Sequence, residues 1–306
     1  MTPSSTSLDV EVGGRHLKIS NIEKVLYPAG GFTKGQVIDY YTRVAPAILP
    51  HLRGRPLTLK RYPNGVDSQF FYEKHCPKHR PEWVPTAAVW SRQNKAEMNY
   101  CLADDLPTLV WVANLAALEL HTLLARADDV GRPTMVVFDL DPGPPAAIRE
   151  CARVALLLRD AFGRCRLESY PKTSGSKGLQ IYVPLNTPVA YGETKAFAHA
   201  MARMLEARHP ELVLSVMAKD LRRGKVFIDW SQNDDSKTTV CVYSLRARPQ
   251  PTVSAPVTWE EVEAAAGGAP LSFEAADVLR RFDADGDLFA PVVSLEQWLP
   301  EVVPAR

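Results

Sequence analysis

The sequence predicts an α+β protein, in which strands and helices follow one another along 306 residues. Short apolar runs that end in turn residues, such as 135–143 and 226–230, are typical of buried strands. Longer segments with apolar residues three and four positions apart, such as 34–52 and 144–162, are typical of helices packed on a core. The length and the 46% hydrophobic content suffice for a single large domain of two packed lobes.

Composition narrows the class of protein. No apolar run approaches the length that crosses a bilayer, and the N-terminus lacks the apolar region of a signal peptide. We therefore expect no membrane partner and a cytoplasmic location. Five cysteines, an odd number without paired spacing, argue against a disulfide framework.

Positive charge is concentrated near the N-terminus. Residues 15–61 carry nine Lys and Arg residues against Glu23 and Asp39, a net charge of +7, although the whole chain carries only +1. This split predicts that the N-terminal part meets a polyanion. A solvated basic face is the alternative, because the sequence does not show whether these charges share one surface.

Two lysines follow residues that begin helices. Ser20 or Asn21 is expected to cap a short helical turn that carries Lys24, and Thr33 is expected to cap a helix that runs from Lys34 to about residue 52. The free N–H groups at the start of a helix suit a phosphate. Lys24 and Lys34 are therefore candidates for a phosphate site.

The other N-terminal elements are a hairpin, a strand, a polar hairpin or loop, and a helix, expected over 10–19, 56–62, 88–104 and 106–125. The last of these would carry His121 in its final turns. Phe70, Phe71 and Tyr72 are consecutive aromatic residues and cannot all face one core. At least one is available to stack on a base, and packing in the core and at its rim is the alternative.

Asp139 and Asp141 end the strand at 135–141. Residues two apart on a strand point to the same face, about 6.5 Å apart, so these carboxylates converge while Leu140 faces the core. Two carboxylates that repel one another favour a hard cation such as Mg²⁺ or Mn²⁺ between them. An acidic surface turn is the alternative, but a third carboxylate, Asp229, ends the strand at 226–230. Three such aspartates can hold two cations about 4 Å apart for displacement at phosphorus.

A glycine-rich segment, 172–178, lies between two expected strands. It lacks the spacing of a P-loop, but its N–H groups, its hydroxyls and Lys177 suit a triphosphate. A hairpin turn that uses glycine for positive φ is the alternative. Arg246 and the basic loop at 219–225 are further candidates for phosphate contacts.

Eight short motifs occur in a fixed order along the chain. They are Glu23–Pro28, Thr33–Lys34, Lys60–Gly65, Phe71–Lys74, Phe138–Pro142, Ser174–Gly178, Lys225–Asn233 and Tyr243–Arg246. Together they resemble the polymerase domain of bacterial ligase D, a branch of the archaeo-eukaryotic primase superfamily. The resemblance implies a primase-type catalytic core of mixed and antiparallel sheets flanked by helices.

The resemblance also implies a division of the chain. Residues 9–290 would form the primase-polymerase domain, after a disordered lead-in at 1–8 and before a tail at 291–306. Within the domain, a basic DNA-end-binding part, a catalytic part and a C-terminal wrap would occupy 9–125, 130–250 and 250–290.

Individual residues receive roles by the same resemblance. Catalysis and the binding of two Mn²⁺ or Mg²⁺ ions would fall to Asp139, Asp141 and Asp229. The incoming nucleotide would be surrounded by Lys60, His121, Ser174, Lys177, Gln180, Arg222, Gln232 and Arg246. A 5′-phosphate across a gap would be bound by Asn21, Lys24 and Lys34, and the template would stack on Phe71 and Tyr72.

The implied activity is template-dependent nucleotidyl transfer. The resemblance implies a DNA polymerase that prefers ribonucleotides, uses Mn²⁺ well, and fills short gaps or bridges broken ends during non-homologous end joining. The substrates would be nucleoside triphosphates and DNA with a gap or double-strand break that bears a 5′-phosphate. Ku and a separate ligase are the implied protein partners, and the bacterial nucleoid is the implied place of action.

One residue departs from the family. Gln180 stands where the family has histidine, and an amide cannot carry the positive charge of an imidazolium beside a triphosphate. A catalytically weak or inactive DNA-end-binding module is therefore an alternative function.

Haloacid-dehalogenase phosphatases are another alternative, since they also begin with an apolar strand and D-x-D. In those enzymes Gly-Thr follows, whereas Pro142-Gly143 follows here.

Overall fold

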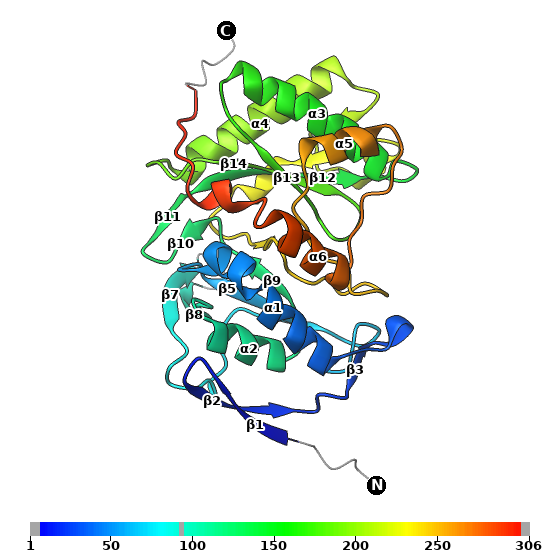
Figure 1. Ribbon diagram of the computed structural model, residues 1–306. Helices are drawn as coiled ribbons and strands as arrows, with labels where there is room; N and C mark the ends of the chain where they lie inside the picture. The colour runs from blue at the N-terminus through cyan, green and yellow to red at the C-terminus, as the bar shows by residue number, and fades with distance from the viewer. Residues whose placement is uncertain (1–6, 92–94, 301–306) are drawn as a thin grey trace. The chain divides into compact units, whose positions relative to one another are not determined.

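The computed structural model describes residues 7–91 and 95–300 (Figure 1). The chain divides into two compact units. The first contains the residues up to Thr122 together with Val240–Ser254 and Phe273–Asp287; the second contains Leu123–Thr239, Ala255–Ser272 and the residues from Leu288 on. Both helices and strands occur in each unit, which confirms the predicted α+β class.

The first unit is built around a six-stranded sheet in the order β17-β9-β5-β8-β7, with β6 also paired to β5. These strands are β5 (Leu57–Arg61), β6 (Phe71–Glu73), β7 (Thr86–Ser91), β8 (Ala96–Cys101), β9 (Ala117–Thr122) and β17 (Thr239–Val240). The smaller pairs are β1 (Ser7–Val12) with β2 (Arg15–Ser20) and β3 (Val25–Tyr27) with β4 (Phe32–Thr33). Its helices are α1 (Lys34–Leu52), α2 (Leu106–Asn114), α6 (Ala275–Asp285) and the short 3-10 turn η1 (Pro28–Gly30).

The hairpin predicted over 10–19 is confirmed, and of the two alternatives for 88–104 the structure has the hairpin. β1 and β2 are antiparallel, and Gly13 and Gly14 form the turn with φ of 53° and 75°, values that glycine adopts without strain. β1 begins at Ser7, so the end of the predicted lead-in belongs to this strand, and residues 1–6 lie outside the described part. The second hairpin consists of β7 and β8.

Helix α1 has the predicted bounds. Thr33 caps it: the Thr33 hydroxyl accepts a hydrogen bond from the Gln36 N–H at 3.3 Å, and the Gln36 side chain accepts one from the Thr33 N–H at 2.8 Å. The buried Tyr41 hydroxyl donates to the Leu118 carbonyl of β9 at 2.7 Å. This bond joins the buried face of α1 to the sheet.

The helix predicted over 106–125 is wrong in its second half. Helix α2 ends at Asn114, Ala116 turns the chain with a φ of 56°, and β9 follows beside β5. β9 is almost wholly buried on both faces, so it lacks the alternation that would distinguish a strand from a helix. His121 therefore lies on a strand, two residues from Glu119.

The second unit contains a five-stranded sheet in the order β13-β14-β12-β16-β15. All neighbours are antiparallel except β15 and β16. The strands are β12 (Met135–Pro142), β13 (Tyr170–Thr173), β14 (Leu179–Pro184), β15 (Val213–Leu214) and β16 (Val226–Asp229), with a separate pair β10 (Ala125–Arg126) and β11 (Asp129–Pro133). The helices are α3 (Ile148–Arg164), α4 (Tyr191–Arg208), α5 (Trp259–Ala266) and the 3-10 turns η2 (Lys219–Arg222), η3 (Trp230–Gln232) and η4 (Ala290–Val293).

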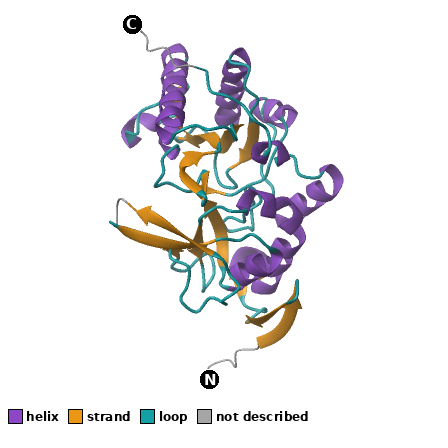
Figure 2. Cartoon of the chain, turned by 90° about the vertical axis from the view of Figure 1, so that its left-hand side faces the viewer, coloured by secondary structure: helices purple, strands orange, loops and turns teal. Residues whose placement is uncertain are grey.

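Helices α3 and α4 cover one face of this sheet, as Figure 2 shows with the helices in purple. Phe138 of β12 packs against Phe162 and Phe197, with ring centroids 5.0 and 6.4 Å apart. Leu140, two residues further on, is fully buried on the same face. Asp139 and Asp141 consequently point to the other face, as the alternation of a strand requires.

Some predicted boundaries in this unit are wrong. Helix α3 begins at Ile148 rather than at residue 144, because Ala147 is extended and its N–H donates to the Glu150 side chain at 2.8 Å, which caps the helix there. The strand expected over 166–170 lies further on, as β13, and α5 was not predicted. The glycine-rich turn between two strands is confirmed, since it joins β13 to β14.

Two cysteines of the first unit are paired. Cys76 and Cys101 form a disulfide with an S–S distance of 2.09 Å, which corrects the expectation from the cysteine count. The Cys76 N–H donates to the Asn99 carbonyl of β8, so the fold itself aligns the segment that carries Cys76 with this strand. A separation of 25 residues gave no sign of this pairing in the sequence.

Among the described residues, no helix is both long and apolar enough to cross a membrane.

Asn233 completes the edge of β12 where β16 has ended. β16 stops at Asp229, opposite Asp139, and at Val137 the side chain of Asn233 replaces a strand. Its amide accepts from the Val137 N–H at 2.9 Å and donates to the Val137 carbonyl at 2.8 Å. Asn233 is completely buried.

Replacing Asn233 with alanine should lower the free energy of unfolding by about 2 to 4 kcal/mol, because two buried backbone groups lose their partner. Urea denaturation followed by circular dichroism measures this loss. Asn64→Ala, at an exposed asparagine, is the control and should change the free energy of unfolding by less than about 0.5 kcal/mol. Equal effects of the two substitutions would contradict this account of β12.

Candidate active site and phosphate pocket

The three predicted aspartates share one face of the five-stranded sheet. Asp139 lies directly opposite Asp229 in the antiparallel register of β12 and β16, and Asp141 follows two residues further along β12. Opposed residues in an antiparallel pair have Cβ atoms about 5 Å apart. The fold thus gathers three carboxylates from two strands, as the sequence predicted.

Burial and the charges of neighbouring carboxylates raise the pKa of two of these aspartates. Burial, the charge of Asp141 and that of Asp229 raise the pKa of Asp139 to about 7, although a hydrogen bond from Gln180 and the charge of Lys172 oppose the shift. Burial also raises the pKa of Asp141, against the charge of Arg222. Bringing these groups together as anions therefore costs free energy in the absence of a cation.

The donor set fits a hard divalent cation. Carboxylate oxygens are the preferred ligands of Mg²⁺ and Mn²⁺, and a divalent ion would relieve the repulsion just described. Within residues 7–91 and 95–300, no three His, Cys, Asp or Glu side chains are already arranged to enclose a metal. Asp229 accepts hydrogen bonds from the Ser231 hydroxyl at 2.5 Å and the Gln232 amide at 3.4 Å.

The glycine-rich turn packs directly on the end of β12. A Cβ on Gly178 would lie 2.0 Å from the Leu140 carbonyl oxygen, so only glycine fits there. The Ser174 hydroxyl accepts from the N–H groups of Ser176 and Gly178, at 3.2 and 3.1 Å. Lys177 is exposed, and its charge acts on Asp141. The turn is therefore held beside the carboxylates with a lysine at its tip.

Arg222 reaches the same carboxylates from η2. Its guanidinium lies 3.8 Å from the Asp141 carboxylate and 4.0 Å from the centre of the Phe227 ring. A Cβ on Gly143 would lie 1.9 Å from the Arg222 carbonyl oxygen, so glycine is required for this close approach. The backbone thus places Arg222 beside β12.

Gln180 lies between a lysine and the first aspartate. It is opposite Asp139 on one side and opposite Lys172 on the other. Its carbonyl oxygen accepts a hydrogen bond from the fully buried Lys172 ammonium at 2.5 Å, and its side chain also hydrogen-bonds Asp139. Lys172 was within a predicted motif but was not singled out from the sequence.

Three predicted nucleotide-binding residues meet in the first unit around a residue that the sequence reasoning missed. The buried Glu119 carboxylate lies 3.4 Å from Lys60, 3.0 Å from His121 and 3.4 Å from Arg246. Burial alone would raise the pKa of Glu119, but the His121 hydrogen bond and the nearby charges lower it to about 2. Burial lowers the pKa of His121. Glu119 and His121 are two residues apart on β9, so their side chains point to the same face. Recognition of β9 as a strand would therefore have identified Glu119 as a neighbour of His121.

Phe71 and Tyr72 are exposed, as stacking on a template requires, but they lie on opposite faces of β6. The Phe71 ring lies under the Arg61 guanidinium, at 5.0 Å. The Tyr72 ring contacts His121 edge-on at 6.2 Å and lies 5.6 Å from the Lys60 ammonium. The two aromatic residues therefore face different groups of basic side chains.

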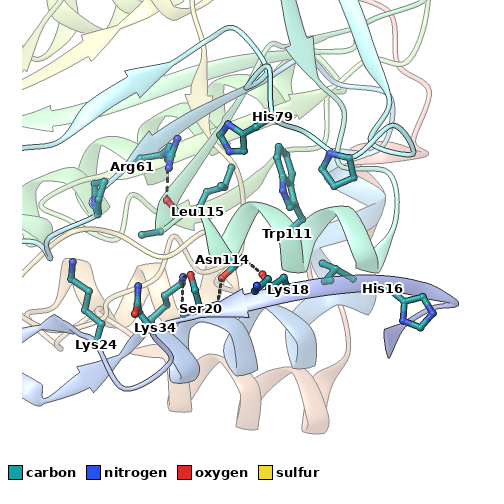
Figure 3. Close-up of a pocket in the computed structure, with 15 residues that line it drawn as sticks. His16, Lys18, Ser20, Lys24, Lys34, Arg61, His79, Trp111, Asn114 and Leu115 are labelled. Carbon is teal, nitrogen blue, oxygen red and sulfur yellow. Dashed lines mark hydrogen bonds between the residues drawn. The ribbon is translucent and has the colours of Figure 1, made fainter. Parts of the chain in front are cut away.

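A pocket of about 510 Å³ in the first unit contains the predicted phosphate ligands (Figure 3). Asn21, Lys24 and Lys34 line it together with Arg61, and it extends past Trp111 to His16 and His79. The Lys34 ammonium donates to the Ser20 carbonyl at 2.6 Å, and Lys24 donates to the Asn64 side chain at 2.8 Å. Arg61 was not assigned to this site from the sequence.

The backbone does not provide the predicted phosphate contacts. Asn21 to Lys24 form a single hydrogen-bonded turn rather than a helix, so no helix begins before Lys24. The N–H groups of Lys34 and Gly35 donate to the Lys24 and Ile22 carbonyls, each at 2.8 Å. Because these N–H groups are occupied, the pocket offers an anion its side chains instead.

Burial, with the charges of Lys24 and Arg61, lowers the pKa of Lys34 to about 8. Three cations held together in this way repel one another. An anion in the pocket would remove that repulsion.

The family model of the LigD primase-polymerase domain matches residues 33–289. The chain is 42% identical over 278 residues to a multifunctional non-homologous end joining protein LigD of Mycolicibacterium smegmatis, and 44% identical over 282 residues to that of Mycobacterium tuberculosis. Each alignment covers 90% of this chain but 36% of the relative, so the chain spans about a third of the length of these proteins.

A solved structure is similar as well. The polymerase domain of Mycobacterium tuberculosis ligase D, in complex with DNA, superposes with a TM-score of 0.86 at 42% identity, over 92% of this chain and 99% of that one. The predicted fold class and family are thereby confirmed. This chain belongs to the LigD primase-polymerase domain family, a family of nucleotidyltransferases.

Proposed function

We propose that this chain extends a DNA strand by template-directed nucleotidyl transfer at gaps and broken ends. The observation that carries the proposal is the row of three carboxylates on β12 and β16 in a chain of this family. Asp139, Asp141 and Asp229 would hold two Mn²⁺ or Mg²⁺ ions, which supply the charge that stabilises the attacking and leaving oxygens. Ribonucleoside triphosphates are the proposed preferred substrates.

The residues around the carboxylates suit a triphosphate. Lys177 and Arg222 bring positive charge to the end of β12, and Ser174 holds the shape of the turn between β13 and β14. In the first unit, Glu119 orients Lys60, His121 and Arg246, which are that unit's proposed nucleotide-binding residues. Burial lowers the pKa of His121, which favours a neutral imidazole that hydrogen-bonds a ribose hydroxyl.

The pocket that contains Asn21, Lys24 and Lys34 is the proposed site for the 5′-phosphate at the far side of a gap. Four features support this use: its size, its three clustered cations, the lowered pKa of Lys34 and the exposed Phe71 beside Arg61. The DNA complex of the similar polymerase domain is consistent with it. Phe71 and Tyr72 are the proposed contacts to template bases.

The biological setting is also a proposal. The similar LigD proteins are named for non-homologous end joining, so we place this activity in the joining of double-strand breaks on the bacterial nucleoid. Ku and a DNA ligase are the proposed partners, because a filled gap must still be held together and sealed.

A DNA-end-binding module with little catalytic activity is the second candidate. Gln180 favours it, since this residue replaces the family histidine. The lysine behind Gln180 argues for activity, because positive charge remains next to this position. Primer extension by the wild type distinguishes the two functions.

Asp139→Ala should reduce extension of a gapped primer with Mn²⁺ and ribonucleotides at least about a hundredfold, because a ligand of the reacting metals is lost. The melting temperature should not fall, since the substitution removes one of three repelling charges. Asp160→Ala, at an exposed aspartate of α3, is the matched control and should extend like the wild type. Wild-type extension by Asp139→Ala would reject the proposed active site, and a wild type without activity would favour the binding module.

Lys24→Ala and Lys34→Ala should each remove most of the preference for a gap with a 5′-phosphate over the same gap with a 5′-hydroxyl. A charge-assisted contact contributes about 1.5–3 kcal/mol, so each loss should be about tenfold or more at low salt. Fluorescence anisotropy measures both affinities. Arg43→Ala removes the same charge from the exposed side of α1 and should leave the preference intact. If all three variants lost the same fraction of the preference, the net charge of the protein, rather than this pocket, would be the cause of the preference.

The preference for a 5′-phosphate should also decline as the pH rises above 8. The pKa of Lys34 is lowered to about 8, so its charge is present at pH 7 and is lost as the pH rises through this value. The phosphate itself stays doubly charged over this range, since its second pKa is about 6. In Lys34→Arg the side chain stays charged, so its preference should change much less between pH 7 and 9.5. Parallel pH profiles for the two proteins would exclude Lys34 as the titrating group.

A further inference from the structure

Four residues form a row across the carboxylate face of the sheet. Lys172, Gln180, Asp139 and Asp229 lie opposite one another on the neighbouring strands β13, β14, β12 and β16. Because β14 separates β13 from β12, the backbones of Lys172 and Asp139 are about 10 Å apart. The lysine thus acts on this aspartate through Gln180.

Gln180 is oriented by both neighbours. Its carbonyl oxygen accepts from the Lys172 ammonium at 2.5 Å, so its NH₂ group is the part that remains to donate to Asp139. Both residues are buried, Lys172 completely and Gln180 at 4% exposure. A rotation of the amide would bring two donors together and two acceptors together. The lysine therefore fixes which group Gln180 presents to the carboxylate.

Asp229 has a similar arrangement at the other end of the row. Lys237 donates a hydrogen bond to the Ser231 hydroxyl, and that hydroxyl donates to the Asp229 carboxylate at 2.5 Å. Since a hydroxyl has one proton, the bond from Lys237 ensures that the proton of Ser231 points to Asp229. Again a neutral group lies between a lysine and an aspartate.

We propose that Lys172 and Lys237 are positioning residues that orient two metal-binding carboxylates, Asp139 and Asp229, through Gln180 and Ser231. This inference rests on the proposed function of the three aspartates. A lysine bonded directly to either carboxylate would compete with a cation for its oxygen atoms. A lysine one neutral group away supplies positive potential and a fixed donor while leaving the other lone pairs for metal.

The arrangement gives Gln180 a role that its family histidine could also perform. A neutral imidazole has one donor and one acceptor nitrogen, as this bridge requires. A leucine has neither. Gln180→His should therefore preserve metal binding and Gln180→Leu should not.

The test measures Mn²⁺ binding to the full chain without nucleotide or DNA, by electron paramagnetic resonance of the free ion. Substitution of a residue behind a metal ligand typically weakens metal affinity 10- to 100-fold. We expect about tenfold weakening in Lys172→Met, Gln180→Leu, Lys237→Met and Ser231→Ala, and less than about twofold in Gln180→His. Lys195→Met removes a lysine of the same unit that is paired with Asp234 at 2.7 Å, and should bind Mn²⁺ like the wild type.

Double substitutions separate the two bridges. Lys172→Met combined with Gln180→Leu should weaken Mn²⁺ binding little more than either alone, because both break one bridge. Lys172→Met combined with Lys237→Met should show the product of the two effects, because the bridges end on different carboxylates. Affinity for gapped DNA and the melting temperature, measured in parallel, show whether the fold is retained.

Unchanged Mn²⁺ affinity in folded Lys172→Met and Lys237→Met would overturn the proposal. If burial of Lys172 prevents its variants from folding, the bridge to Asp229 still tests the proposal, because Lys237 is only half-buried. Ser231→Ala should then weaken Mn²⁺ binding, and Ser231→Thr should restore it, since threonine keeps the hydroxyl. Asp139→Ala identifies the other kind of failure. If it binds Mn²⁺ and extends primers like the wild type, the proposed active site is wrong; if only the lysine variants behave like the wild type, the positioning role alone is wrong.

Discussion

The second unit depends on holding three like charges on one face of a sheet. The register of β12 and β16 fixes Asp139 opposite Asp229, and neither can move away without breaking the ladder. Burial of the apolar face beneath, where Phe138 and Leu140 pack under α3 and α4, offsets the unfavourable free energy of this repulsion. Because packing keeps the carboxylates together, a cation that binds between them gains the free energy of relieving their repulsion.

The first unit has the opposite arrangement of charge, with basic side chains grouped around an acidic one. Its sheet holds the buried Glu119 carboxylate, which contacts the side chains of Lys60, His121 and Arg246 and fixes their positions. In the pocket around Lys24 and Lys34, Arg61 is paired with Glu73 at 2.7 Å, whereas the Lys34 ammonium donates to the neutral Ser20 carbonyl, and burial lowers the pKa of Lys34. Glu119 thus partly neutralises the charges of Lys60 and Arg246, whereas the charge of Lys34 is one that a bound anion could neutralise.

The parts of the site that were predictable from the sequence depend on neighbours in the chain. D-x-D at a strand end, the cap at Thr33 and the glycines of the first hairpin each act within a few residues. Glu119 and the disulfide between Cys76 and Cys101 escaped prediction because they depend on which strands pair. β9 was mistaken for helix because burial on both faces removes the polar alternation of an exposed strand. The family resemblance supplied roles for His121 and Arg246 that periodicity alone would not have given.

The order of the chain through the two units has a consequence for how the protein is made. Arg246 and α6 belong to the first unit but follow most of the second in the sequence. Synthesis proceeds from the N-terminus, so the residues up to Thr122 are made before Arg246 and α6. Until those are made, Glu119 lacks its contact with Arg246, and α1 lacks its contact with α6. No single cut in the chain separates the two units, and a truncation before Arg246 would leave the buried Glu119 without this partner. We expect the two units to mature together, late in synthesis, rather than one after the other.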